Sequence, residues 1–588
     1  MRSKHFASLL VAAALPACIG DLGETGSSSG EPKEPSTPTN FVCDPNLPPE
    51  TLPLRRLSHV QYTNTVRDLV RVAAGDEADA VIAAVEPLFD QVPDDARKGK
   101  DKHYGGFTRL DQAVQQEHVD ATYGVAAAVG AELTGTTARL ERLAGTCAVD
   151  ADPANDDPCL DELIRTFGRS ALRRPATDED VAFYRTVAGS APFEPADYAD
   201  VVALMMVSPH ALYLVEHGAG DGDYVRLDDF ELASRLSYHF WQTMPDDGLL
   251  AAAESGALST QSGFRAEVDR LFADPRTRVA VRQFFSEWLE NTTLEELDSR
   301  AGNPVFEAFR GSTEVGPELR ERMLEEVVDA ATYYTFESGS TFDDFLASDR
   351  SFARTPDLAA IYETPVWDGS SEPPVFADPT RVGLVGRAAF LATGSANTRP
   401  IMKGVFLRIA LLCDDIPPPP PNAAASPPML SEDSTTRQVV EELTGSGSCA
   451  GCHTHVINPL GFVTEGFDAL GRTRTEQRFF DEETGAEIGS APIDSAATPM
   501  VDSDDSSVVK SAAELTDKLL ASEKPHACFA RHYFRFSFGR LEDLDGDACA
   551  LDTIKVSLDE GAALAESIRA VALSDAFQRR SFVEEDAQ

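Results

Sequence analysis

The chain has 588 residues, of which 97 are acidic and 51 basic, giving a formal net charge of −46 at pH 7. This charge argues against a nucleic-acid partner, because contacts to phosphate groups need lysine and arginine side chains. An apolar content of 42% is enough for large hydrophobic cores, and the length favours several domains over one. The composition therefore indicates an acidic, well-solvated multidomain protein that binds no nucleic acid.

The N-terminus has the pattern of a bacterial lipoprotein export signal. Arg2 and Lys4 precede an apolar run over 6–17, which is too short to cross a bilayer as a helix but fits a secretory signal. The run leads into Leu-Pro-Ala-Cys, a pattern similar to a lipobox, so residues 1–17 are a predicted signal peptide and Cys18 a predicted lipidation site. An ordinary signal followed by an incidental cysteine is the alternative. We expect an exported protein, anchored by its lipid to the outer membrane at the periplasmic or surface face.

The rest of the chain divides into a tether and a mainly helical body. Residues 18–42 are rich in Gly, Ser, Pro, Glu and Thr and cannot bury an apolar face, which predicts a disordered tether. Ser58 and Thr177 each precede a helical stretch and are predicted N-caps, and a third helix starts at Asp228 or Asp229, either of which can cap it. The first stretch places four residues on one predicted apolar stripe: Val60, Val66, Leu69 and Val70.

Strand signals are few and short, so the predicted fold is mainly α, with a multi-segment helical body followed by a cytochrome c-like helical module. Pro417–Pro421 predict a stiff polyproline rod in front of that module. The predicted segments after the tether are an N-terminal helical segment 43–150, helical segments 155–217 and 224–355, a haem-binding segment 379–480 with its motif after the rod, and a C-terminal helical segment 505–582.

The functional prediction depends on one motif, Cys449-Ala450-Gly451-Cys452-His453. Two thiols at CxxC spacing can form thioether bonds to the vinyl groups of haem, and the adjacent histidine then lies beneath the iron as its axial ligand. Export agrees with this, because c-type haem is attached outside the cytoplasm. The predicted cofactor is one covalent haem c on Cys449 and Cys452, with His453 as iron ligand. Half a zinc site and a dithiol or disulfide are the alternatives, and only His455 lies near as a further zinc ligand.

The residues after the motif include candidates for the surroundings of the haem. Pro459 lies six residues beyond His453, and its carbonyl is a candidate acceptor for the imidazole N–H. Phe462, Phe467 and Leu470 are candidate walls of the haem site, with an ordinary hydrophobic core as the alternative.

The sixth iron ligand is less well defined by the sequence. Met500 lies at a suitable distance downstream and is the candidate, with His526 and His532 as alternatives. Methionine or histidine would make an electron-transfer centre, whereas an open position would allow oxygen or peroxide chemistry.

Six of the nine cysteines remain if Cys18 carries lipid and the motif carries haem. An even number in an exported protein suits disulfides. Cys147 and Cys159 enclose a short acidic loop and are the favoured pair, and Cys528 with Cys549 is the second pair.

Five phrases occur in a fixed order: RRLSHVQYTNTVRDLV, FGRSALRRPATDEDVAFY, LDDFELASRLSYHFWQTMPDDGLL, CAGCHTHVINPLGFVTEGFDALGRTR and CFARHYFRFSFGR. Together they resemble a large, poorly characterised bacterial family of exported proteins. Its members consist of consecutive domains of unknown function, in the order DUF1587, DUF1595, DUF1592, DUF1588 and DUF1585, with a cytochrome c-like CxxCH segment. The resemblance implies export, this domain order and haem attachment at the motif. Members commonly have Asp where this chain has Asn458.

Three functions are compatible with the sequence and with the resemblance, which implies no settled reaction. The first is periplasmic or cell-surface electron transfer to an unidentified redox partner. The second is a haem-dependent oxidative enzyme, an oxidoreductase acting on an extracellular substrate. The third is a non-catalytic binding or scaffold lipoprotein. A low-spin six-coordinate spectrum favours the first, a high-spin spectrum that shifts with cyanide the second, and an absence of haem the third.

Overall fold

The computed structural model describes residues 38–582, except Glu50, Pro53, Lys102, Asp221, 418–430 and Ser448. The predicted signal peptide, the lipidation site at Cys18, most of the tether and most of the polyproline rod lie outside the described residues. The described chain is mainly α, as predicted, with three two-stranded antiparallel sheets. None of its described helices has the length and apolar character of a transmembrane span.

The described chain forms two compact units, each assembled from separate stretches of sequence. The CxxCH unit contains Leu294–Met323 and Ala347–Lys524, and therefore the CxxCH motif. The larger unit contains Pro38–Thr293, Leu324–Leu346 and the segment that starts at Pro525.

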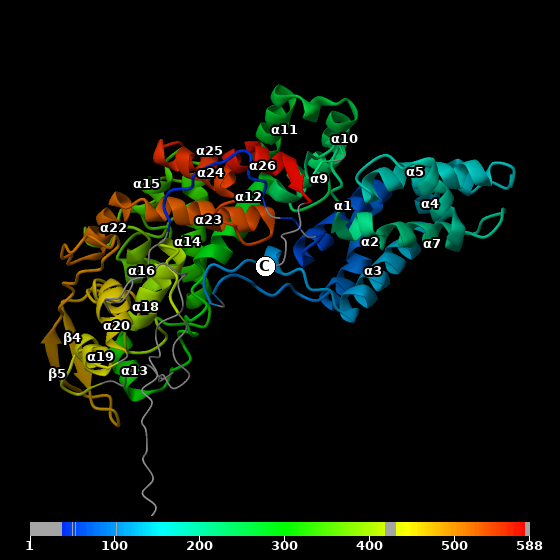
Figure 1. Ribbon diagram of the computed structural model, residues 1–588. Coiled ribbons are helices and arrows are strands. Elements are labelled where there is room, and N and C mark those ends of the chain that lie inside the picture. The colour runs from blue at the N-terminus through cyan, green and yellow to red at the C-terminus, as the bar shows by residue number, and fades with distance from the viewer. Residues whose placement is uncertain are drawn as a thin grey trace, which may run out of the picture. The chain divides into compact units, whose positions relative to one another are not determined.

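Helices dominate the larger unit, and Figure 1 shows α1–α5 and α7 as a bundle beside a second group that includes α9, α12 and α23–α26. Its short sheets pair β1 (Arg55–Arg56) with β2 (Tyr213–Leu214) and β3 (Tyr224–Arg226) with β6 (Arg579–Ser581). The helices that lie wholly or mainly in this unit are α1 (His59–Ala74), α2 (Ala78–Val85), α3 (Gln116–Thr134), α4 (Thr137–Ala144), α5 (Asp156–Ala171), α6 (Asp178–Tyr184), α7 (Pro195–Met206), α8 (Pro209–Leu212), α9 (Asp229–Phe240), α10 (Asp247–Glu254), α11 (Gln261–Ala273), α12 (Pro275–Leu289), α14 (Leu319–Phe336), α15 (Phe342–Leu346), α23 (Lys524–Phe538), α24 (Ala548–Asp559), α25 (Leu564–Leu573) and α26 (Asp575–Gln578).

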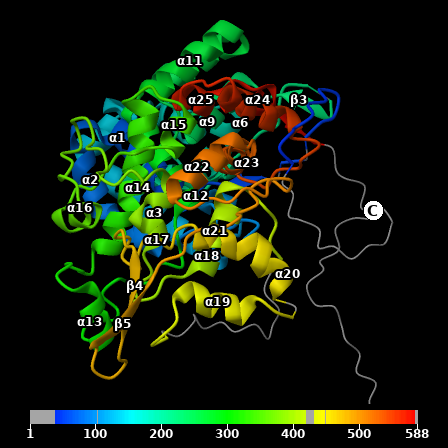
Figure 2. The ribbon, with the colours of Figure 1, turned by 90° about the vertical axis from the view of Figure 1, so that its left-hand side faces the viewer.

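The CxxCH unit contains shorter helices and one hairpin, which joins β4 (Glu476–Phe480) to β5 (Glu487–Pro492). Figure 2 shows α18, α19, α20 and α21 gathered beside this hairpin. The helices of this unit are α13 (Pro304–Arg310), α16 (Pro356–Tyr362), α17 (Ala388–Leu391), α18 (Pro400–Phe406), α19 (Thr436–Thr444), α20 (Ala450–Cys452), α21 (Asn458–Phe462), α22 (Ala512–Ala521) and the π-helices η8 (Leu407–Leu411) and η9 (His453–Ile457). Short 3-10 helices across the described chain are η1 (Gly75–Glu77), η2 (Glu86–Gln91), η3 (Thr108–Leu110), η4 (Thr146–Ala148), η5 (Arg185–Val187), η6 (Ala257–Ser259) and η7 (Leu384–Gly386).

Helix starts follow the predicted capping residues. The side chains of Ser58, Thr177 and Asp228 accept from backbone N–H groups at the starts of α1, α6 and α9, and each forms a reciprocal capping box. The predicted stripe of α1 is confirmed for Val66, Leu69 and Val70, which are buried, but it is wrong for Val60, whose side chain is 39% exposed. Six residues of α-helix separate Val60 from Val66, which places them about 120° apart around the axis.

Two disulfides hold the larger unit. Cys147 is joined to Cys159, which is the favoured pair of the sequence analysis. Cys549 is joined to Cys43, 506 residues away, so the predicted pairing of Cys549 with Cys528 is wrong. The error has a physical reason: the C-terminal helices return to the start of the folded chain, and spacing along the sequence does not reveal such a return.

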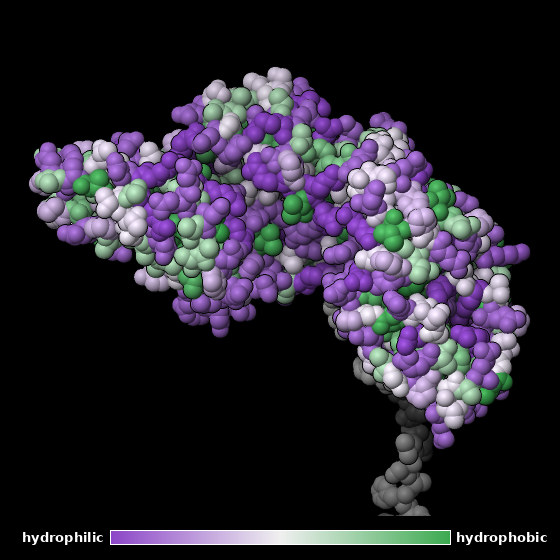
Figure 3. All heavy atoms as spheres, turned by 180° about the vertical axis from the view of Figure 1, so that it is seen from behind, coloured by the Kyte–Doolittle hydropathy of each residue, from purple (hydrophilic) through white to green (hydrophobic). Residues whose placement is uncertain are grey.

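The surface agrees with the acidic composition. On the face shown in Figure 3, hydrophilic residues predominate and hydrophobic ones are scattered among them, without a broad apolar patch. Such a surface fits the expected solvation of a chain with net charge −46.

Candidate haem site

The CxxCH motif lies on consecutive helical turns. Cys449 directly precedes α20, and its carbonyl accepts from the His453 N–H at 3.0 Å, so the two residues are one turn apart. Residues at positions i, i+3 and i+4 share one helix face, which places Cys449, Cys452 and His453 together. Cys449 is a free and exposed cysteine, whereas Cys452 and His453 are half-buried. Since Cys449 is free, the two cysteines of the motif are not joined to each other.

A chain of hydrogen bonds orients the imidazole ring of His453. The Thr444 hydroxyl donates to the Val440 carbonyl at 2.6 Å, so its oxygen accepts from the Asn458 Nδ2 at 2.9 Å. This orients the Asn458 amide with Oδ1 toward the His453 Nδ1, at 3.0 Å. An amide oxygen can only accept, so the Nδ1–H of His453 donates to it, and in the neutral ring Nε2 is then the nitrogen that keeps a lone pair. A neutral imidazole in this tautomer can bind a metal through Nε2.

Pro459 was expected to accept the imidazole N–H of His453 with its carbonyl, but in the structure this carbonyl has another partner. The Pro459 carbonyl accepts from the Val463 N–H at 3.3 Å within the turn that closes α21. The imidazole N–H of His453 is taken instead by the side chain of Asn458, which is 2% exposed. The acceptor for the imidazole N–H is thus the buried amide of Asn458 and not the predicted proline carbonyl. Asn458 stands at the position where members of the resembling family commonly have Asp.

Two glycines set the distance between α18 and the motif segment. A Cβ on Gly404 would overlap the carbonyl oxygen of Ile457 in η9, and a Cβ on Gly461 would overlap the carbonyl oxygen of Pro400. Only glycine allows this approach of backbone to backbone, because any other residue would have to displace a main-chain atom. The helix that carries His453 is therefore seated rigidly against α18.

Arg408 connects the motif segment with the loop that holds Met500. Its side chain is almost fully buried and donates from Nε to the Val456 carbonyl at 3.0 Å. Its Nη2 donates to the carbonyls of Pro499 and Met500 at 2.7 and 3.0 Å, and its Nη1 to Asp414 at 2.8 Å. The Met500 backbone, at a left-handed φ of 46°, is thereby held beside the end of the helix that begins at His453.

The three candidate wall residues all lie in the interior of the CxxCH unit. Leu470 belongs to a hydrophobic cluster with Phe306, Phe309 and Phe480. The Phe467 ring lies 4.7 Å below the guanidinium of Arg381, and the Phe462 ring lies at the same distance from Arg437. Their described contacts are those of core packing.

The alternative histidine ligands belong to the larger unit. Both ring nitrogens of His526 are taken by carboxylates, Asp343 at 2.7 Å and Asp559 at 2.8 Å. Burial opposes the charged ring, but these two hydrogen bonds raise the pKa of His526 above its ordinary value. His532 is completely buried against the rings of Trp288 and Phe107. Engaged in this way, His526 has no nitrogen left for a metal.

Sequence reasoning missed Thr444 and Arg408. Thr444 ends α19 and looks like an ordinary helix-terminal threonine, and Arg408 stands among apolar residues of η8. The signal available in the sequence was a single charged residue, Arg408, within an apolar run. A charged side chain in such a run needs several fixed partners if it is buried.

The protein is mainly α, and its CxxCH motif lies on a helical segment. The histidine of this motif can bind a metal through Nε2 when its ring is neutral. Comparison with known protein families identifies the domains that make up the chain. Four models, each described as a protein of unknown function, match in succession: DUF1595 over residues 159–216, DUF1592 over 227–364, DUF1588 over 381–477 and DUF1585 over 505–577. The chain therefore contains consecutive domains of unknown function, and these four follow one another in the order expected of them. The CxxCH motif lies within the DUF1588 match.

No curated protein and no solved structure matches the chain.

Proposed function

We propose that the chain is an exported lipoprotein that carries one covalent c-type haem and takes part in electron transfer in the periplasm or at the cell surface. Cys449 and Cys452 hold the haem by thioether bonds, His453 binds the iron through Nε2, and Met500 is the candidate sixth ligand. Cys18 carries the lipid anchor. The N-terminal segment, ahead of the DUF1595 match, corresponds to the DUF1587 domain of the resembling family. When bound, the haem supplies one-electron exchange.

One observation supports this proposal above the others. The relay from Thr444 through Asn458 engages the Nδ1–H of His453, so Nε2 is the nitrogen with a lone pair in the neutral ring of the residue that follows Cys452. A disulfide function needs no such control of a histidine tautomer. A zinc site would need further ligands, and the nearest candidate, His455, is exposed two residues away. The donor set therefore fits haem better than either alternative.

The clamp formed by Arg408 adds support for a six-coordinate centre. It holds the Met500 loop to the motif helix through three backbone carbonyls, so the two segments keep a fixed spacing. If His453 and Met500 both held the iron, this fixed backbone spacing would lower the reorganisation that accompanies electron transfer. Substrate oxidation would instead need an open iron position, and no described feature of the site calls for one.

The direct test is the full chain, produced in a bacterial host together with cytochrome c maturation proteins. We expect a Soret band, a sharp low-spin spectrum on reduction, and haem that stays with the polypeptide on a denaturing gel. We also expect the protein in the detergent-extracted membrane fraction. Colourless protein would contradict the haem, and recovery in the aqueous periplasmic fraction would contradict the anchor.

Replacing Asn458 by aspartate is expected to lower the reduction potential of this centre. A carboxylate accepts more strongly than an amide from the His453 Nδ1–H, which raises the basicity of the ring and favours oxidised iron. The Thr444 hydroxyl can rotate to donate to the new carboxylate. A tenfold change in the relative stability of the two iron states is about 59 mV, so a fall of this order is expected in a spectroelectrochemical titration.

Asn303→Asp is the matched control, because Asn303 is an exposed N-cap of α13 in the same unit, where aspartate caps equally well. This control should leave the potential unchanged. An unchanged potential in Asn458→Asp as well would show that Asn458 does not bond the iron-ligating ring.

A further inference from the structure

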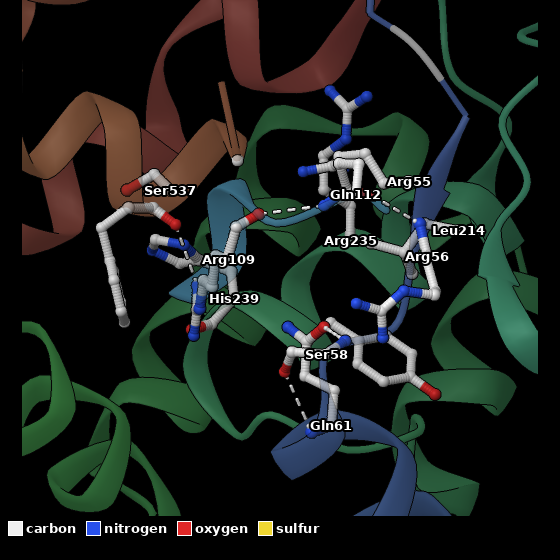
Figure 4. A pocket seen from close by; sticks show the side chains of 13 residues that line it. Arg55, Arg56, Ser58, Gln61, Arg109, Gln112, Leu214, Arg235, His239 and Ser537 are labelled. Atoms are coloured by element: carbon white, nitrogen blue, oxygen red, sulfur yellow. Dashed lines mark hydrogen bonds between the residues drawn. The ribbon is translucent and has the colours of Figure 1, made fainter. Parts of the chain in front are cut away.

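The larger unit contains a cavity of about 30 Å³, which does not involve the haem motif. Figure 4 shows the side chains of Arg55, Arg56, Arg109 and His239 around it. Arg235 is a further arginine in the lining. A water molecule needs about 10–15 Å³ by the same measure, so the space fits two waters or one small ion. The wall is thus unusually rich in arginine for so small a space.

The arginines outnumber the carboxylates that neutralise them. Glu216 is the ion-pair partner of both Arg55, at 3.1 Å, and Arg235, at 2.6 Å, and Asp95 is the partner of Arg56. Arg109 makes no ion pair with any described residue. Its guanidinium lies 3.7 Å over the Phe536 ring, and it donates only to the carbonyls of Phe536 and His239. Glu287 is the carboxylate whose charge acts most strongly on Arg109, without forming an ion pair with it. The four arginines of the lining are thus matched by three carboxylates, which leaves an excess of buried positive charge.

Three N–H donors of the cavity wall are unused. The Nε atoms of Arg55, Arg56 and Arg109 are buried and have no hydrogen-bond partner. Arg55 and Arg109 are only 8% and 7% exposed, so water at the surface does not solvate them. A buried donor without a partner costs about 1–3 kcal/mol, and charged donors cost more. Three such donors around one cavity indicate an acceptor that belongs inside it.

His239 adds no further charge to this wall. Burial lowers the pKa of His239 well below its ordinary value, and the charges of Arg109 and Arg55 act in the same direction. Burial also lowers the pKa of Arg109 to about 10, so this guanidinium stays protonated at neutral pH. The electrostatic field of the cavity is therefore set by arginine, whose charge is permanent under these conditions.

We propose that this cavity binds one small anion, of the size of chloride or of a single carboxylate group, through the Nε–H groups of Arg55, Arg56 and Arg109. Arginine N–H groups form strong charge-assisted hydrogen bonds to such anions. One negative charge would satisfy the open donors and offset the excess positive charge at the same time. Chloride and the carboxylate of a small organic acid would both accept these charge-assisted hydrogen bonds.

The test uses the full chain and the line width of the chloride-35 NMR signal. We expect the wild-type protein to broaden the signal beyond the broadening produced by Arg109→Gln, which should weaken chloride binding at least about tenfold. Arg165→Gln is the control, because Arg165 is a partly exposed arginine paired with an exposed aspartate on the surface of the same unit. This control should broaden the signal like the wild type.

Sodium acetate, added at constant ionic strength, distinguishes the two sources of the anion. Reversal of the broadening at acetate concentrations below those of chloride identifies a carboxylate site, and persistence identifies a chloride site. Crystals of the wild type soaked in sodium bromide provide a readout that does not need a folded variant, since an anomalous peak is expected against the three Nε atoms. No excess broadening and no bromide peak would overturn the proposal.

Discussion

Replacing Cys449 and Cys452 together by serine is expected to abolish covalent haem attachment completely. Serine cannot form the thioether bonds, so haem stain on a denaturing gel should fall from one haem per chain to none. The effect should be confined to the cofactor. Cys449 is exposed and Cys452 half-buried, so serine creates no cavity in the core, and the haem-free chain should change in stability by no more than about 0.5 kcal/mol.

Gly451→Ala is the matched control within the same motif. A Cβ at Gly451 would meet no atom within 4 Å, so this spacer position accepts alanine. The control should keep its haem. Haem that remained on the denatured double variant would exclude attachment at the motif. Stoichiometric zinc in the wild type, lost in the double variant, would identify a zinc site instead.

Local features of the fold were predictable because they are encoded within one helical turn. Ser58, Thr177 and Asp228 cap their helices as expected, since a capping side chain needs only a backbone N–H three residues away. The disulfide between Cys147 and Cys159 was predictable because its two cysteines are only 12 residues apart along the chain.

Features that depend on distant residues were not predictable. Cys549 pairs with Cys43, 506 residues away. This pairing requires the C-terminal helices to return to the first described residues, which the sequence does not reveal. Arg408 acts on carbonyls 48 and 92 residues further along the chain, and no periodicity marks such a contact. The partner of His453 was missed for a different reason. A proline carbonyl was expected from analogy, whereas the turn that closes α21 uses that carbonyl and leaves the side chain of Asn458 for the ring.

The buried ion cluster at Glu216 shows what holds the larger unit together. Arg235 makes two hydrogen bonds to the Glu216 carboxylate, at 2.8 and 2.6 Å, and Arg55 makes a third at 3.1 Å. Arg580 lies at 3.8 Å. Since Arg55 and Arg580 come from opposite ends of the described chain, one carboxylate joins the N-terminal and C-terminal strands of this unit.

Glu216→Gln is therefore expected to destabilise the larger unit by about 3–5 kcal/mol at pH 7, as is usual when one member of a buried ion pair is removed. Glutamine keeps the shape of the side chain but leaves three buried arginines without their carboxylate. Chemical denaturation followed by circular dichroism measures the loss. Glu254→Gln is the matched control, because Glu254 is 63% exposed in its pair with Arg169, and a change below about 1 kcal/mol is expected there.

The pH dependence separates loss of charge from loss of packing. Burial would raise the pKa of Glu216, but the charges of Arg235 and Arg55 outweigh burial and lower it to about 2, from an ordinary value of 4.5. The carboxylate thus stabilises the folded state fully above pH 4.5, and this contribution, about 3 kcal/mol, disappears as the pH falls from 4.5 through 2. The wild type should lose stability over that range, and Glu216→Gln should lose correspondingly less. Equal acid sensitivity of the two proteins would mean that the Glu216 carboxylate does not hold this cluster.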